Sequence, residues 1–74
     1  MTDDVIGLRK RSVLLSGHAT SVALEPEFWE ILEAIAASRG LGVAGVIGAI
    51  DAGRGKRPLA SACRLAALEH LRAG

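Results

Sequence analysis

The segment that most constrains this chain is a short alternation of side chains that ends where a helix begins. Thr20, Val22 and Leu24 fall on one side of an extended backbone, and the residues between them fall on the other. This alternation of period two is typical of a strand with one buried face. A lone short strand leaves its backbone N–H and C=O groups without partners, so a second strand has to supply them.

The second strand has two possible sources. The simplest is the same segment of another copy, paired antiparallel about a two-fold axis. The alternative is a hairpin within the chain, in which residues 12–15 fold back on residues 20–24 around a break at Ser16-Gly17. Half of the 74 residues are hydrophobic, which is a high fraction for a chain with so much surface per volume. This composition favours a second copy.

A chain of this size also needs an additional source of stability, because one small core rarely supplies more than about 3–5 kcal/mol. Cys63 is the only cysteine, so no disulfide can form within the chain. Cys63, His18 and His70 lack the spacing of metal ligands, and we expect no metal site and no cofactor. Oligomerisation is the remaining source.

Three helices are predicted after the strand. Pro26 suits a first helical position and Gly40 suits the position after a helix, which predicts a helix over residues 26–39. A second helix is predicted from residue 43 to near residue 53, and a third over about residues 59–72. The third has apolar side chains around much of its surface, so we expect it to cover a partner subunit.

The run from Ser16 to Trp29 resembles the ribbon-helix-helix domain family, in a variant common in alphaproteobacterial proteins. The resemblance continues through residues 36–41, 50–52 and 65–72, and it covers about residues 9–72. It implies a mainly α fold with one short strand, an intertwined homodimer with an intermolecular two-stranded antiparallel ribbon, and a third, C-terminal helix.

Two further expectations concern organisation. Residues 1–11 are expected to be a flexible basic arm, and residues 12–74 to be the ribbon-helix-helix domain with its C-terminal helix. The resemblance implies a core shared by two copies. Its expected members are Val22, Leu24, Phe28, Leu32, Ile35, Val46, Ile47 and Ile50.

The resemblance implies a DNA-binding transcriptional regulator whose paired strands enter the major groove of double-stranded DNA. Ala19, Ser21 and Ala23 would then face the groove. The family usually has longer or polar side chains at these positions, so this chain departs from the family where sequence is read. Gly42 and Val43 begin the second helix, where free backbone N–H groups suit a phosphate. The family commonly has Ser or Thr where this chain has Gly42, so only backbone anchoring is expected.

Charge is segregated along the chain although the formal net charge is only +1. Arg9, Lys10 and Arg11 form one basic cluster, and residues 54–57 contain another. The first cluster could track phosphates as part of a flexible arm. The second is more simply interpreted as a solvated loop.

A protein-interaction module is the alternative to DNA binding. The near-neutral charge and the departures at Ala19, Ala23 and Gly42 suit a protein-interaction or antitoxin-like dimerisation module with reduced DNA readout. An enzyme is not expected, because no acid and base are paired and Gly53–Lys56 lacks the spacing of a phosphate-binding loop. No signal peptide or membrane span is recognisable, which predicts a cytoplasmic location. The resemblance implies a bacterial protein.

Overall fold

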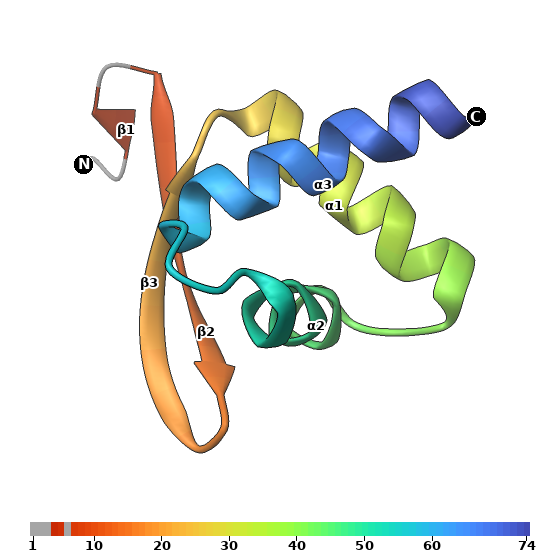
Figure 1. Ribbon diagram of the computed structural model, residues 1–74. Coiled ribbons are helices and arrows are strands. Elements are labelled where there is room, and N and C mark those ends of the chain that lie inside the picture. Colours follow the sequence, from red (N-terminus) through yellow and green to blue (C-terminus); the bar gives the residue numbers. More distant parts are fainter. Residues whose placement is uncertain (1–3, 6) are drawn as a thin grey trace.

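A β-hairpin is followed by three helices in the computed structural model, which describes residues 4–5 and 7–74 (Figure 1). Residues 1–3 and 6, which belong to the predicted arm, lie outside the described residues. The elements are β1 (Asp4–Val5), β2 (Leu8–Leu15), β3 (His18–Leu24), α1 (Pro26–Arg39), α2 (Val43–Gly53) and α3 (Leu59–Ala73). The three predicted helix ranges agree with these bounds to within one residue.

The second strand comes from the same chain. β2 and β3 pair antiparallel from Arg9–Leu24 at the open end to Leu15–His18 at the turn. The structure thus has the hairpin that the sequence left as the alternative, and β2 is longer than the segment expected there. Residues 8–11, predicted as part of a flexible arm, lie in β2 because their backbones pair with β3 and with the short β1.

The turn explains why a hairpin forms here. Ser16 and Gly17 are the two residues between the strands, and their φ angles are 50° and 83°. Positive φ at both central residues is the requirement of a type I′ turn, whose twist matches that of the strands it joins. Glycine adopts this conformation without the steric cost of a Cβ atom.

We expect Gly17→Ala to lower the free energy of unfolding by about 1–2 kcal/mol, because an L side chain in the left-handed region meets its own backbone. No other atom lies within 4 Å of the added Cβ, so the effect isolates the backbone. Gly53→Ala is the matched control: φ there is not positive, its space is also open, and alanine should stabilise the helix end slightly. Urea unfolding followed by circular dichroism would measure both variants, and equal stability of Gly17→Ala and wild type would contradict the turn assignment.

The end of α1 is set by Gly40. Its φ of 68° is left-handed, the Gly40 N–H donates to the Ala37 carbonyl, and the Leu41 N–H donates to the Ala36 carbonyl at 2.9 Å. These two bonds form the Schellman pattern that caps the last carbonyls of a helix. The chain then turns sharply, and α2 is bent by 98° from α1.

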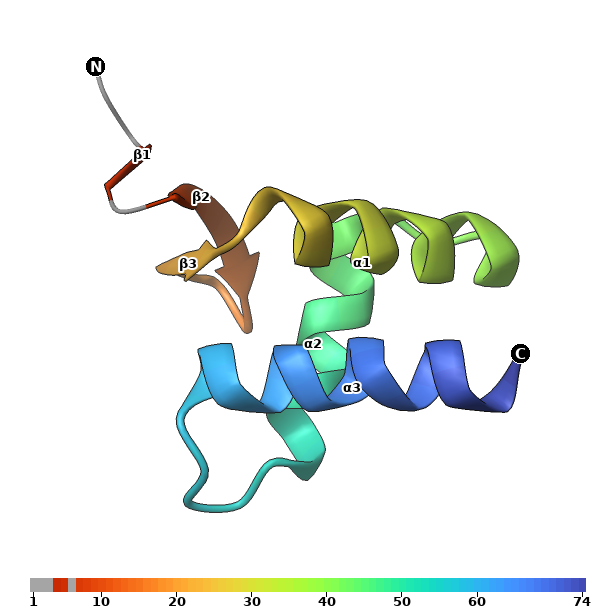
Figure 2. The same cartoon turned by 90° about the horizontal axis from the view of Figure 1, so that it is seen from above.

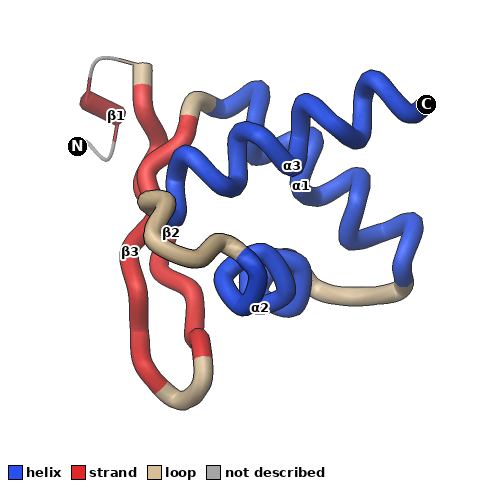
Figure 3. The backbone as a smooth tube through the Cα atoms, in the orientation of Figure 1, coloured by secondary structure: helices blue, strands red, loops and turns tan. Residues whose placement is uncertain are grey.

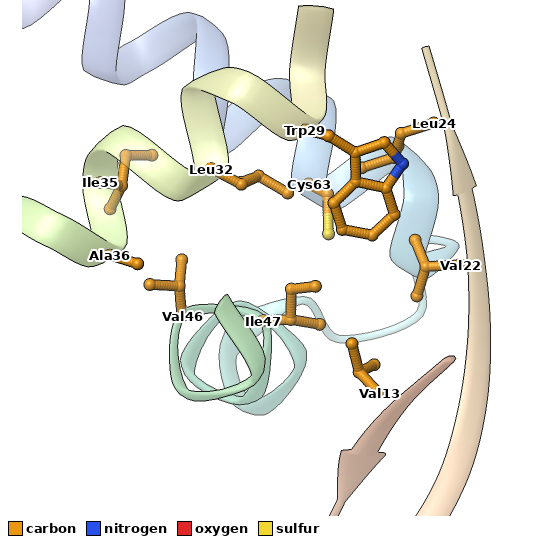
Figure 4. Close-up of a cluster of buried hydrophobic side chains, with 10 residues drawn as sticks. All are labelled: Val13, Val22, Leu24, Trp29, Leu32, Ile35, Ala36, Val46, Ile47 and Cys63. Atoms are coloured by element: carbon orange, nitrogen blue, oxygen red, sulfur yellow. The ribbon is translucent and has the colours of Figure 1, made fainter. Parts of the chain in front are cut away.

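The helices all lie on one side of the hairpin, with α2 crossing α1 and α3 (Figures 1 and 2). Between them lies one hydrophobic core, drawn in Figure 4. Its buried members are Val13, Val22, Leu24, Trp29, Leu32, Ile35, Ala36, Val46, Ile47 and Cys63. The third helix contacts α1, α2 and β3 of its own chain, and its covering of a partner subunit stays a prediction.

Within the described residues, no individual helix is both long enough and apolar enough to span a membrane. Only α1 and α2 taken together meet that criterion, and the sharp bend separates them. The same part of the chain contains no cluster of three or more His, Cys, Asp or Glu residues that could hold a metal ion.

Candidate functional site

The hairpin has two different faces. Val13, Val22 and Leu24 point toward the helices and are buried. Successive side chains of a strand point to opposite faces, so the residues between these form the opposite face, which we call the outer face. It consists of three directly opposed pairs, Lys10–Ala23, Ser12–Ser21 and Leu14–Ala19.

The outer face is accessible. Its residues are exposed apart from Ala23, which is half-buried, and the Leu14 side chain is 65% exposed. The helices lie behind the hairpin, and the turn end of the hairpin projects past α2 (Figures 1 and 3). The hairpin is therefore a projecting two-stranded ribbon with one free surface.

The sequence predicts the β3 half of this surface and, on β2, Lys10. Ala19, Ser21 and Ala23 lie on the outer face, as their alternation with Thr20, Val22 and Leu24 predicts. Ser12 and Leu14 were not recognised, because β2 lacks a regular alternation of polar and apolar residues. The buried Val13 and the turn at Ser16-Gly17 are the signals that could have located them.

The basic cluster of residues 9–11 is divided between the two faces. Lys10 lies on the outer face. Arg11 points toward α1, where its Nη1 donates to Oε2 of Glu33 at 2.9 Å and its guanidinium lies 4.6 Å from the centroid of the Trp29 ring. Arg9 lines the same hollow as Arg11, and its carbonyl accepts a 2.8 Å hydrogen bond from Nε1 of Trp29. Of these three cations, only Lys10 faces outward from the ribbon.

The start of α2 does not share the outer face. Gly42 caps the helix with an extended backbone, and its carbonyl accepts from the N–H groups of Gly45 and Val46. Glycine has no side chain and so offers no hydroxyl group, and the next residue, Val43, is half-buried. In Figure 1, α2 lies on the same side of the hairpin as α1 and α3, opposite the outer face. A single chain therefore does not present Gly42 and Val43 on the same surface as Ser21.

The second basic cluster is held by its own interactions. Nε of Arg54 donates to Oδ1 of Asp51 at 2.6 Å, and Nη1 of Arg54 donates to the Arg57 carbonyl. Another arginine, Arg64, donates to Oε1 of Glu25 at 2.9 Å, and this hydrogen bond lowers the pKa of Glu25. The two hydrogen bonds of Arg54 give this loop residue a structural role, which agrees with the interpretation of residues 54–57 as a loop.

The residues expected in a shared core lie in the core of one chain. Val22, Leu24, Leu32, Ile35, Val46 and Ile47 are buried there, and Phe28 and Ile50 are partly buried at its edge. Cys63 is fully buried among them, as expected for a small core residue, and burial raises the pKa of its thiol. A buried thiol with a raised pKa is a poor nucleophile.

The outer face has the chemistry of a binding surface: hydroxyl groups that donate and accept, small apolar side chains, and one cation. The model of the ribbon-helix-helix domain family matches residues 8–71. A comparison with curated proteins gives no match. Among solved structures, an uncharacterized protein from Bordetella pertussis Tohama I is similar, with 33% sequence identity and a TM-score of 0.78. The similarity covers 96% of this chain but only 61% of that one.

Proposed function

The chain belongs to the ribbon-helix-helix domain family, and we propose that it is a DNA-binding transcriptional regulator in the bacterial cytoplasm. Proteins with this non-enzymatic fold are generally DNA-binding regulators. The observation that carries the proposal is the exposed, projecting outer face of the hairpin. The major groove is about 12 Å wide and admits a two-stranded ribbon, and paired strands lie about 4.8 Å apart.

The proposed DNA contacts follow from where each residue lies. Ser21, Ala19 and Ala23 are proposed to face base edges, and Lys10 at the open end of the ribbon is proposed to contact phosphate. Arg9 and Arg11 are not proposed as DNA contacts, because they lie on the face of the hairpin that packs against the helices.

We also propose that the protein acts as a homodimer. One exposed feature supports this: α3 carries exposed leucines at positions 65, 68 and 71. A second copy could place the α2 start, Gly42 and Val43, beside a phosphate through its backbone N–H groups. Light scattering at micromolar concentration measures the molar mass of the protein bound to DNA. The mass of a single bound chain would contradict this part of the proposal.

The DNA-binding proposal predicts that Lys10→Ala weakens binding to random duplex DNA. Loss of one phosphate contact should reduce the slope of log affinity against log salt by about 0.9 per bound chain. Lys56→Ala is the matched control, because Lys56 is also an exposed lysine and lies in the loop between α2 and α3. Fluorescence anisotropy over a series of salt concentrations measures both slopes. Equal slopes for Lys10→Ala and wild type would exclude Lys10 as a phosphate contact.

A protein-interaction module is the second candidate, and the exposed leucines of α3 favour it. Leu65, Leu68 and Leu71 are between 40% and 59% exposed, which is apolar area suited to a protein partner. An antitoxin-like version would use this surface for its partner. A well-folded protein that binds no duplex DNA at low salt would favour this candidate over the first.

A further inference from the structure

The composition of the outer face is unusual for a solvated sheet. Antiparallel sheets with one face in water commonly carry polar side chains on that face. Here Leu14, Ala19 and Ala23 are apolar, and Lys10 is the only charged residue of the six. Among the large hydrophobic side chains of the described residues, Leu14 is the most exposed.

These side chains match the chemistry of the major groove. Thymine presents a C5-methyl group there, and apolar side chains recognise it by contact. Leu14 and Ala19 form a directly opposed apolar pair near the turn. Ser12 and Ser21 form the neighbouring pair, and each hydroxyl can both donate to and accept from a base edge.

The spacing along β2 also fits a duplex. A strand rises about 3.3 Å per residue, so Lys10 and Leu14 are about 13 Å apart along the ribbon. That distance corresponds to about four base-pair steps of 3.4 Å. Lys10 can therefore lie at phosphate while Leu14, close to the projecting turn, lies deeper along the groove.

We propose that Leu14 reads a thymine methyl group, with the Ser12–Ser21 hydroxyl pair beside it, so that both strands of one chain's own hairpin read DNA sequence. This inference rests on the proposed DNA binding. It differs from reading by two β3 strands of a dimer. Pairing at the β3 edges would make a six-stranded sheet with the two β3 strands at its centre, and β2 would then lie outside a groove about 12 Å wide.

The test is a cycle of substitutions in protein and DNA. Duplexes that wild-type protein selects from a random library are resynthesised with deoxyuridine replacing each thymine in turn, which removes only the methyl group. Wild type should lose about fourfold in affinity at one position, the value expected for one buried methyl group. Leu14→Ala should bind the thymine and deoxyuridine duplexes equally at that position. Leu41→Ala, which changes an exposed leucine in the connection between α1 and α2, should keep the wild-type sensitivity.

The outcomes separate the inference from the function on which it rests. If wild type binds no duplex DNA at low salt, the proposed function fails and the inference with it. If wild type selects a sequence but no deoxyuridine weakens binding, only the inference fails. The same holds if Leu14→Ala keeps the wild-type sensitivity at every thymine. Loss of sensitivity in Leu14→Ala alone supports the inference.

Discussion

Replacing Trp29 with alanine is expected to lower the free energy of unfolding by about 3–5 kcal/mol, the range for truncating a buried aromatic side chain. Trp29 is 4% exposed and joins α1 to the hairpin. Its Nε1 donates to the Arg9 carbonyl, and Arg11 stacks on its ring. Because a core of this size supplies only about 3–5 kcal/mol, the variant should be largely unfolded at 25 °C. Urea unfolding followed by circular dichroism measures the change.

Trp29→Phe separates the two roles of this side chain. The smaller ring stays buried, but the Arg9 carbonyl loses its hydrogen bond from Nε1. This hydrogen bond is only partly buried, so its loss should cost about 0.5–1.5 kcal/mol, and the variant should fall between wild type and Trp29→Ala. A loss of less than about 1 kcal/mol in Trp29→Ala would show that the ring does not hold α1 on the hairpin.

Leu32→Ala is expected to lower the free energy of unfolding by about 2–5 kcal/mol, because it removes a fully buried side chain and leaves a cavity. The side chain points from α1 into the core drawn in Figure 4. Leu41→Ala makes the same chemical change in the connection between α1 and α2, where the leucine is 47% exposed, and should change stability by no more than about 0.5 kcal/mol. Thermal and urea unfolding of the two variants give the comparison. Similar losses in both would contradict the placement of Leu32 in the core.

The elements with regular patterns could be predicted from the sequence, and β2 could not. Pro26 and Gly40 mark the limits of α1, and the alternation ending at Leu24 marks β3. In β2, two inward positions carry arginine and an outward position carries Leu14, so the segment resembles a basic arm. Arg11 can face inward because it forms a salt bridge with Glu33 and lies over the Trp29 ring. These partners are distant in the sequence, so no local pattern indicates them.

The packing of the third helix within its own chain could not be predicted from its apolar pattern either. The residues buried there are the small ones, Ala62, Cys63 and Ala67. Small side chains let the helix approach its own chain closely. The leucines of α3 are left partly exposed, so the apolar surplus noted in the composition lies there and on the outer face.

The in-chain hairpin also changes what a second copy is needed for. With β2 supplying the paired strand, the hydrophobic core closes within one chain. The radius of gyration is 11.8 Å, close to the value of about 11 Å for a compact chain of this length. Dimer formation is therefore not required to bury the core, and the proposed homodimer serves DNA binding.

The most direct measurement of DNA binding by the outer face is an NMR titration of isotopically labelled protein with duplex DNA at low salt. The predicted result is a set of chemical-shift changes concentrated on Lys10, Ser12, Leu14, Ala19 and Ser21, which reverse as salt is added. Shifts confined to α3, or a spectrum unchanged by excess DNA, would contradict the assignment of the hairpin's outer face as the DNA-binding surface.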